Sequence, residues 1–422
     1  MGMLKSRKAF RVFSLGMAAV LAAAGCSSGT AEEREPAAQN VTVTWWDYFG
    51  YSPGSNKAVE ALITRYQEAH PNVQINRTAI PFPEFHTKIV ESVSAGTFPD
   101  IAVIDTPDVP LLASQGALAD LTGRYKGWSK SNQFLEPVLE SVNHDDKLYG
   151  VPLRSNTTAL IYNKDLFGKA GIAGPPATWA DLRANAKALT KDGASGLCFA
   201  AGPNESTTFN VLPFVWMAGG DVTAINDKPA VEALTYVHDL FNVDKSVPEA
   251  ALRWTHSDVE KEFVAGRCAM MINGPWVLPG MQKATFQWGT APLAAGSKGV
   301  VSPLGGEAWV VGAKSNNADV AWDVLTWLAE SRNSAHEFGS GLGSIPNRND
   351  TLNDPVWKWG PGVGAFISEM LSTRSRSQYG PKYARVSEAI WTMTHQVVKK
   401  EKKPQAAAND AQATIRPLLP SS

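Results

Sequence analysis

The sequence has few of the residues that build metal centres, disulfide scaffolds or the common hydrolytic sites. It contains three cysteines and seven histidines in 422 residues, and the histidines lack the spacing of metal ligands. It has no HExxH or GxSxG motif, and its glycine-rich stretch at 339–346 lacks the Gly-Lys-Ser/Thr ending of a phosphate loop. We therefore expect no metal and no cofactor.

Net charge is also almost absent. The chain carries 39 lysines and arginines against 40 aspartates and glutamates, which gives a formal net charge of −1, and it has no basic run. A nucleic acid or an acidic membrane surface is therefore not expected as the main partner.

The length and the 44% hydrophobic residues indicate a globular protein of two or three domains. Tryptophan is abundant, at 14 residues.

The N-terminus has the pattern of an export signal. Four basic residues precede the apolar run VFSLGMAAVLAAAG, which is too short to span a bilayer as a permanent helix. The stretch LAAAGCSSG resembles a bacterial lipobox, with Ala23 in place of the consensus leucine. The resemblance implies a lipoprotein signal peptide over 1–25, lipid such as palmitate on Cys26, a flexible tether over 26–40, and anchoring at the outer face of the cytoplasmic membrane. An ordinary secretory signal that happens to contain a cysteine is the alternative.

The two remaining cysteines lie in short apolar runs, GLCFA and RCAMMI, which predict strands. An exported protein folds in an oxidising compartment, where neighbouring cysteines can pair. We predict a disulfide between Cys198 and Cys268, and two buried free thiols are the alternative.

Strand and helix patterns alternate along the mature chain. The runs VTVTWW, NVQINRTAI and PDIAVI predict strands, and the segments between them repeat apolar residues at helical spacing. This alternation predicts an α/β protein with a mainly parallel sheet, whose ligands bind at the carboxyl ends of the strands. Trp46, Asp47 and Tyr48 lie at the end of the first predicted strand, and Asp105 follows the third. The same pattern begins again with ALIYNKDLF, which predicts a second lobe.

One apolar run ends abruptly at a turn, in the stretch MMINGPW at 270–276. The sequence Asn-Gly-Pro is strong turn punctuation, so the run is predicted to be a strand that stops there. Trp276 then stands on a rigid loop at the end of a strand. A large aromatic ring in such a place either fills a core or forms a platform for a ligand.

Seven segments in order resemble the extracellular solute-binding proteins of sugar-importing ABC transporters, among them the maltose- and maltodextrin-binding proteins. These segments are WWDY, SAGTFPDIAVID, KLYGVPLRSNTTALIYNKDLFGKAGI, PPATWADL, WMAGGD, EFVAGRCAMMINGPW and PLGGEAWVVGAKS. The resemblance extends over nearly the whole mature chain, and the third, fourth and sixth segments are its most specific parts.

The resemblance implies the two-lobe, type II periplasmic-binding-protein fold, in which a hinge joins two α/β lobes, each a mainly parallel sheet flanked by helices. Proteins of this kind trap one solute between the lobes and deliver it to a permease. The positions predicted here are 41–153 and 306–345 for lobe one, 155–303 and 346–422 for lobe two, and 151–157, 302–307 and 343–349 for the hinge crossings.

The resemblance also implies which residues contact the solute. A sugar ring has apolar faces and a rim of hydroxyls, so it requires aromatic platforms together with carboxylates, amides and guanidinium groups. Asn156 stands where the maltose binders have a carboxylate, which puts maltose itself in doubt. The predicted contacts are Trp46, Asp47, Tyr48, Asp105, Arg154, Asn156, Glu205, Phe209, Trp276, Gly305, Gly306, Glu307 and Tyr379.

Several of these residues are also suited to a structural role. Trp276 is alternatively a packing residue. Trp45 and Trp46 point to opposite faces of a strand, so the assignment of Trp45 to the core and Trp46 to the cleft can be reversed. Asp47 and Asp105 are also suited to capping helices.

The charged residues of the predicted crossings can likewise serve the fold instead of the solute. Arg154 is alternatively a surface charge or part of a hinge salt bridge, and Glu307 alternatively accepts hydrogen bonds from backbone. The register near Tyr379 is loose, so Tyr383 and Arg374 are further candidates in that late segment.

The expected ligand is a di- or oligosaccharide, with an α-linked glucose disaccharide such as trehalose or maltose first. An amino sugar, a polyol or a glycerophosphodiester is the alternative, because relatives with this scaffold bind them. The implied partners of the expected monomer are two membrane-spanning permease subunits with a cytoplasmic ATPase. We do not expect an enzyme; a surface-anchored glycoside hydrolase, with Glu205 and Glu307 as its two carboxylates, is the alternative of another class.

Overall fold

The computed structural model describes residues 39–420, except residues 192 and 331 and the side chains of residues 83, 332 and 333. The predicted signal peptide and the predicted lipid site at Cys26 lie outside the described residues. The chain divides into Met1–Gln39 and the compact unit Asn40–Ser422. None of the helices in the described part is both long and apolar enough to cross a membrane.

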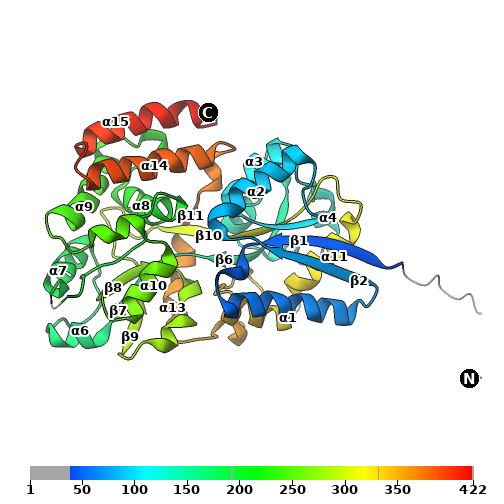
Figure 1. Ribbon diagram of the computed structural model, residues 1–422, viewed down its shortest axis with the longest axis horizontal. Helices are drawn as coiled ribbons and strands as arrows, with labels where there is room; N and C mark the ends of the chain where they lie inside the picture. Colours follow the sequence, from blue (N-terminus) through cyan, green and yellow to red (C-terminus); the bar gives the residue numbers. More distant parts are fainter. Residues whose placement is uncertain (1–38, 192, 331, 421–422) are drawn as a thin grey trace, which may run out of the picture. The chain divides into compact units, whose positions relative to one another are not determined.

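Lobe one is built on a sheet whose first three strands in the chain are parallel and form one end of it (Figure 1). β1 (Val41–Asp47) lies between β2 (Val73–Ala79) and β3 (Ile101–Asp105) and runs parallel to both. β1 alternates between its two faces and buries Val43 and Trp45 in the core. β3 is buried in all but its last residue, because a central strand is covered on both faces.

The long strand β10 (Ser302–Val311) extends this sheet. It runs antiparallel to β3 and to β6 (Gly150–Asn156), and β11 (Thr373–Ser375) pairs with its first residues. β6 and β10 are buried along their whole lengths. These two strands therefore form a rigid, dry base for the side chains that project from them.

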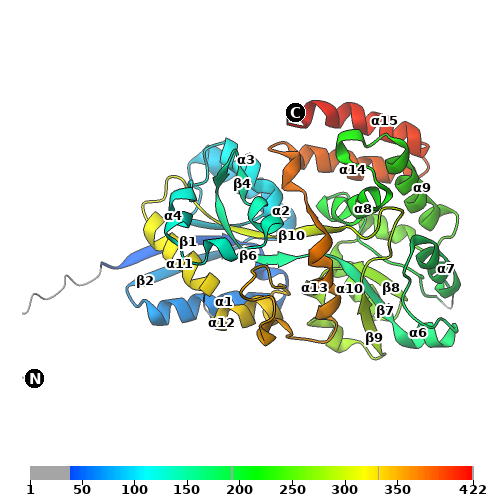
Figure 2. The same ribbon diagram turned by 180° about the vertical axis from the view of Figure 1, so that it is seen from behind.

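Helices flank the sheet of lobe one (Figure 2). α1 (Pro53–Ala69) begins at a capping box formed by Ser52 and Ser55. α2 (Phe82–Ala95) ends at Gly96, whose φ of 69° forms a left-handed cap. The other elements of this lobe are α3 (Val109–Ser114), α4 (Thr122–Gly127), α5 (Glu136–Glu140), β4 (Asn143–His144), β5 (Lys147–Leu148), α11 (Ala318–Glu330) and α12 (Arg332–His336).

Lobe two is built on three short strands surrounded by helices. β7 (Ala159–Asn163) lies between β8 (Met270–Asn273) and β9 (Trp288–Ala291) and is antiparallel to both. The central helix α8 is buried from Ser206 to Ala218, so other helices pack around it. The helices of this lobe are α6 (Lys164–Lys169), α7 (Trp179–Leu189), α8 (Glu205–Ala218), α9 (Lys228–Asn242), α10 (His256–Val264), α13 (Val363–Glu369), α14 (Tyr383–Val398) and α15 (Pro404–Ile415).

The predicted two-lobe α/β fold is confirmed, but its sheets are less parallel than expected. In lobe two, β7 begins at the crossing and runs away from it, whereas β8 ends there, with Ala159 opposite Asn273. Two strands that start and stop at the same crossing in this way must be antiparallel. In the described part of the chain, parallel neighbours join this three-stranded sheet through isolated bridges, for example between Cys198 and Met271.

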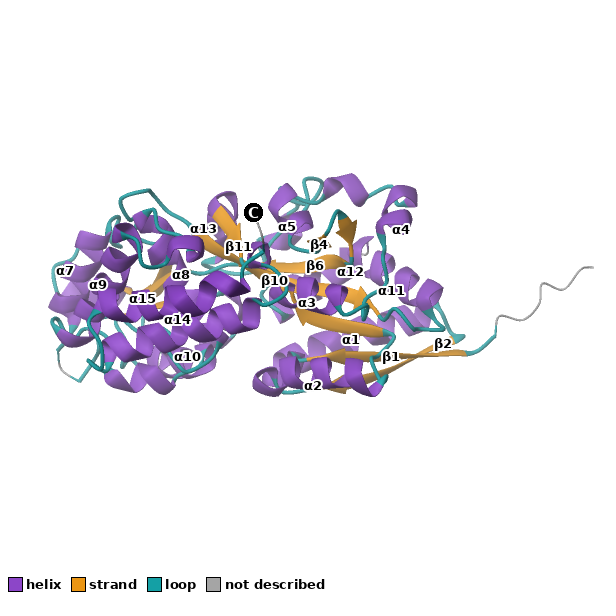
Figure 3. Ribbon diagram, turned by 90° about the horizontal axis from the view of Figure 1, so that it is seen from above, coloured by secondary structure: helices purple, strands orange, loops and turns teal. Residues whose placement is uncertain are grey.

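The chain crosses between the lobes on β6, which leads into β7, and on β10 (Figure 3). The two crossings approach closely at Gly305 and Gly306. A Cβ atom on Gly306, whose φ is 130°, would lie 2.2 Å from the carbonyl oxygen of Arg154. A Cβ atom on Gly305 would lie 2.2 Å from the Asn156 side chain. Only glycine fits at these two positions.

The third connection lies close to lobe one beyond the predicted crossing at 343–349. The amide of Leu135 donates to the Asn347 carbonyl (3.0 Å), and the amide of Asn349 donates to the Gln133 carbonyl (2.7 Å). The chain has reached lobe two by Gly362, whose carbonyl accepts a hydrogen bond from the Thr290 hydroxyl (2.8 Å).

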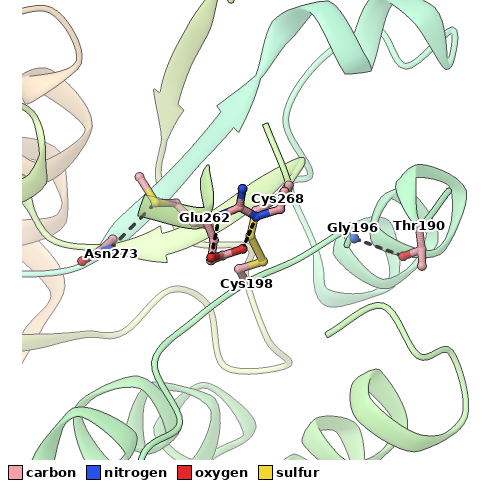
Figure 4. Close-up of a disulfide and its surroundings, with 8 residues drawn as sticks. Thr190, Gly196, Cys198, Glu262, Cys268 and Asn273 are labelled. Atoms are coloured by element: carbon pink, nitrogen blue, oxygen red, sulfur yellow. Dashed lines mark hydrogen bonds and ion pairs between the residues drawn. A yellow bond between two sulfur atoms is a disulfide. The ribbon is translucent and has the colours of Figure 1, made fainter. Parts of the chain in front are cut away.

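Cys198 and Cys268 form a disulfide in lobe two, beside the Glu262–Arg267 ion pair (Figure 4). Their Cα atoms are 6.0 Å apart, and 70 positions separate them in the chain. The disulfide closes a loop that contains α8, α9 and α10. By the chain-entropy argument, a loop of this length contributes about 4.4 kcal/mol to stability.

Candidate functional site

Three charged side chains lie side by side where β3, β10 and β6 pair. The register places Glu307 of β10 opposite Asp105 of β3 on one side and opposite Arg154 of β6 on the other. Directly opposed residues of antiparallel strands project from the same face of the sheet, a few ångströms apart. Asp105 also ends its strand, so this group lies at a strand end, where α/β proteins place their ligands.

Glu307 is held by two donors from different elements. Its Oε1 accepts a hydrogen bond from the Tyr48 hydroxyl (2.9 Å) and is ion-paired with Nη1 of Arg154. Arg154 also donates from Nε (2.9 Å) and Nη2 (2.6 Å) to the carbonyl oxygen of Leu342. Within the described residues, the second carboxylate oxygen of Glu307, Oε2, is buried and has no hydrogen-bond partner.

Arg376 connects Asp105 of lobe one with Glu205 of lobe two. Its Nη1 and Nη2 lie 3.2 and 3.1 Å from the two carboxylate oxygens of Asp105, which is a bidentate arrangement. Nη1 is also ion-paired with Glu205. Arg376 is 2% exposed, so a buried guanidinium joins carboxylates from the two lobes.

Glu205 stands at the N-terminus of α8, where the helix dipole favours a negative charge. Its carboxylate accepts hydrogen bonds from Tyr383 (2.7 Å) and Ser387, which lie one turn apart on α14. These contacts fix the orientation of Glu205 toward the other lobe.

Aromatic rings lie beside this charged group. The guanidinium of Arg376 lies 4.6 Å above the ring of Phe209, and the ring of Trp276 lies 6.3 Å from that of Phe209. His256 contacts Trp276 edge to face, with ring centres 5.2 Å apart. A Cβ atom on Gly274 would lie 2.0 Å from the Trp276 ring, so the turn glycine is required for the position of this ring.

Burial and charge shift the pKa values of several of these groups. Burial, opposed by Arg376 and reinforced by the neighbouring carboxylates, raises the pKa of Asp105 to about 7. Burial, together with the positive charge of Arg376, lowers the pKa of His256 to about 4. The hydrogen bond from His86 to Asp108 raises the pKa of the His86 imidazole. Perturbed pKa values of this kind are typical of functional sites.

The structure brings most of the predicted contact residues together. Tyr48, Asp105, Arg154, Glu205, Phe209 and Glu307 belong to the charged and aromatic groups described above, and Trp276 borders them. Asn156, with its amide oxygen turned toward Arg154, accepts from Nη1 of Arg154 (3.1 Å) and from the Gly306 amide (3.3 Å).

Asp47 takes a structural role. It is 0% exposed, and its carboxylate pairs with Arg77 (2.6 and 2.8 Å) and accepts from the Phe49 amide (2.8 Å). Trp45, at 1% exposure, lies in the core, while Trp46 is half-buried on the opposite face of β1. The capping role considered for Asp105 is not realised, because its side chain makes no cap hydrogen bond.

Tyr379 lies in the core of lobe two and does not contact the charged group. Its hydroxyl accepts from the Trp216 indole (3.0 Å) and donates to Asp221 (3.3 Å). Arg376 and Tyr383, from the same late segment, contact Glu205 instead. Arg376 directly follows the end of β11, and this position at a strand end is the signal that could have identified it.

His256 is the other residue that sequence reasoning missed. It lies at the start of α10, after a capping box, and its Nε2 lies 3.1 Å from the amide nitrogen of Asn210. Nothing in the spacing of the histidines marks it, because its contacts come from distant elements.

A cavity of about 320 Å³ lies in lobe one, lined by residues that include Phe134, Leu153, Arg348 and Trp357. None of the predicted contact residues lines it. In the described part of the chain, no group of three or more histidine, cysteine or carboxylate side chains is placed to hold a metal ion.

Comparisons with known proteins agree with this architecture. A family model described as bacterial extracellular solute-binding protein matches residues 61–365. The maltodextrin-binding protein of Bacillus subtilis is 26% identical over 345 residues, which cover 76% of this chain and 78% of that protein.

Two solved structures have the same fold. The GacH receptor of Streptomyces glaucescens, solved without ligand and with acarbose, is 26% identical, with a TM-score of 0.80 over 90% of this chain and 98% of that one. An ABC transporter solute-binding protein from Thermotoga lettingae, bound to α-D-tagatose, is 25% identical, with a TM-score of 0.80 over 90% of this chain and 100% of that one.

Proposed function

The chain belongs to the bacterial extracellular solute-binding protein family, and from this premise we propose that it captures a di- or oligosaccharide between its lobes for an ABC importer. One observation carries the proposal. Hydrogen-bonding side chains of lobe one, lobe two and the crossing strands converge beside a pair of aromatic rings, with Asp105, Glu205 and Glu307 as the carboxylates.

This set of groups suits the chemistry of a sugar. The C–H face of a pyranose ring stacks on an aromatic ring, and Trp276 is half-buried on a loop that its turn glycine holds in place. Carboxylates and guanidinium groups bind the hydroxyl rim in pairs, because vicinal hydroxyls match their bidentate geometry. The site therefore offers both surfaces that a sugar presents.

Capture follows from contacts that only the closed form can make. A ligand that touches Asp105 in lobe one and Glu205 in lobe two at once binds the closed arrangement more tightly than the open one. The hinge equilibrium shifts by that difference in affinity. Arg376 already links the same two carboxylates, so it positions both of them for the ligand.

The relatives support a saccharide as the ligand. The Bacillus subtilis protein is named for maltodextrin, and the Streptomyces glaucescens receptor was solved with acarbose. Within this class, we propose an α-linked glucose disaccharide such as trehalose or maltose as the first candidate. Asn156 differs from the carboxylate of the maltose binders, so trehalose is to be tested alongside maltose.

A thermal-shift screen tests the proposal. Residues 40–422 are screened against glucose disaccharides, longer glucans, cello- and xylo-oligosaccharides, polyols and glycerophosphodiesters, followed by calorimetry on each hit. A ligand that binds the folded protein raises its melting temperature. Recovery of the intact saccharide after overnight incubation supports a binding protein, whereas its cleavage supports a glycoside hydrolase. A shift with none of the saccharides contradicts the proposal.

The importer supplies the remaining partners. We propose that lipid on Cys26 anchors the monomeric protein outside the cytoplasmic membrane, and that two permease subunits with a cytoplasmic ATPase receive the ligand. Metabolic labelling with a palmitate analogue tests the anchor. Label on the native chain and none on Cys26→Ser is expected, and label on both would contradict the assignment.

A further inference from the structure

The charged group between the lobes contains more carboxylates than cations. Two carboxylates have a cation of their own, since Glu307 is paired with Arg154 and Asp108 is paired with His86. Arg376 is shared between the other two. The members of the group are Asp105, Asp108, Glu205 and Glu307 as acids, and His86, Arg154 and Arg376 as cations.

Nearby cations of the chain are committed elsewhere. Arg77 forms its two-bond ion pair with Asp47, and Arg374 is ion-paired with Asp221 while it lies 5.4 Å above the Trp216 ring. Among the described residues, one carboxylate of the group therefore has no cation of its own, even when His86 is protonated. A buried carboxylate without a counter-charge is costly, so in the free protein a proton offsets part of this charge, in keeping with the raised pKa of Asp105, and a positive charge from outside the chain can take the place of that proton.

A second observation locates the place for that charge. Glu307 is 4% exposed, and its Oε2 is buried without a hydrogen-bond donor among the described residues. The strand register puts Asp105 directly opposite Glu307. Like charges in directly opposed positions of a sheet repel each other, and a positively charged donor between them offsets the repulsion and also satisfies the unmet acceptor.

We propose, on the basis of the saccharide-binding function above, that the ligand is an amino-substituted saccharide whose ammonium group binds between Glu307 and Asp105. An ammonium group has three donors and no acceptor, so it matches two acceptor-only carboxylates. A hydroxyl satisfies the hydrogen bond of Oε2 but brings no positive charge to the group. A phosphate or a carboxylate on the ligand adds to the negative charge and is rejected.

The test compares matched saccharides that differ in one group. For trehalose, maltose and cellobiose, calorimetry measures the affinity of the neutral sugar, of its amino-deoxy counterpart and of the N-acetylated form of that amine. The acetylated form keeps the nitrogen and removes its charge. We expect at least one amino sugar to bind more tightly than both of its neutral counterparts, by about tenfold or more. The reason is that a desolvated charge pair contributes more than a neutral hydrogen bond.

Variants assign the preference to the two carboxylates. In Glu307→Gln, the amide oxygen can keep the bond from Tyr48 while the negative charge is lost, so the amino sugar should lose its advantage over the neutral sugar. Asp105→Asn provides a second variant if the first does not fold. Glu262→Gln, which changes a carboxylate on α10 paired with Arg267, is the control and should keep the preference.

The outcomes separate this inference from the function on which it rests. Equal or tighter binding of the neutral sugars overturns the amine and leaves saccharide capture intact. An amine preference that survives in both Glu307→Gln and Asp105→Asn overturns the assigned position. Binding of none of the sugars, amino-substituted or neutral, overturns saccharide capture and the amine together.

Discussion

Two aspartates of lobe one show how differently the same residue is used. Asp47 ends β1 and Asp105 ends β3, and the two strands are parallel neighbours. Asp47 has an arginine to itself, Arg77, and a backbone amide as well. Asp105 shares Arg376 with Glu205 of the other lobe. A carboxylate with complete local partners stabilises its lobe, whereas one with shared, distant partners is available to a ligand.

The largest expected effect concerns Asp47. Asp47→Ala leaves the half-buried Arg77 without its counter-ion and the buried Phe49 amide without its acceptor, so the free energy of unfolding should fall by about 3 kcal/mol. Urea unfolding followed by tryptophan fluorescence measures this change. Asp105→Ala is the matched control, and its cost should be smaller because Glu205 still pairs with Arg376. An equal loss of stability in the two variants would remove the distinction between these aspartates.

The next effect concerns ligand affinity at Trp276. Trp276→Ala removes the proposed platform, and the affinity for the saccharide found by screening should fall about 10- to 100-fold, through lost stacking and lost apolar contact. Calorimetry measures the affinity. The matched control is Asp47→Asn, which should bind the ligand normally if it folds. Unchanged affinity in Trp276→Ala would assign this ring to packing alone.

A smaller effect is expected in the pH dependence of stability. The pKa of Asp105 is raised to about 7 in the folded protein. Between the ordinary pKa of an aspartate and this value, the folded protein therefore holds a proton that the unfolded chain has released. The stability that this proton provides is present at low pH and is lost as the pH rises through about 7. Asp105→Asn should reduce this loss by about 1–2 kcal/mol between pH 4 and pH 7. Unfolding curves at a series of pH values measure the slope, and an unchanged slope would contradict the shift.

The smallest effect has the opposite sign. The pKa of His256 is lowered to about 4, so the unfolded chain binds a proton that the folded protein excludes between that value and the ordinary pKa near 6.5. Stability contributed by neutral His256 is lost as the pH falls through this range. His256→Gln should reduce this acid sensitivity by about 1 kcal/mol or less. A two-dimensional NMR titration of the imidazole gives the pKa directly, and a value near 6.5 would refute the assignment.

Much of the candidate site could be predicted because strand ends and turns are local features. The carboxyl end of PDIAVID marks Asp105, and Asn-Gly-Pro marks the loop that carries Trp276. Glu307 and Arg154 were predicted from the resemblance to the solute-binding proteins, which places them in the crossing segments. The disulfide between Cys198 and Cys268 follows from apolar runs that form neighbouring backbone bridges.

The roles of several side chains depended on partners that local sequence does not show. Asp47 and Asp105 have the same position at a strand end, and only the arginine that each meets separates their roles. Arg77 is 30 residues from Asp47, whereas Arg376 is 271 residues from Asp105. Tyr379 and Tyr383 lie four residues apart, yet one faces the core of lobe two and the other faces Glu205.

The sequence by itself determined the two-lobe α/β architecture, the strand ends and the aromatic loop, because periodicity and turn chemistry act over a few residues. The tertiary structure alone decided which charged groups meet, because an ion pair depends on distances between segments that fold together from far apart in the chain. Arg376 is the clearest case. No local pattern indicates that it lies between two lobes, and its burial among Asp105, Glu205 and Phe209 gives the site its charge.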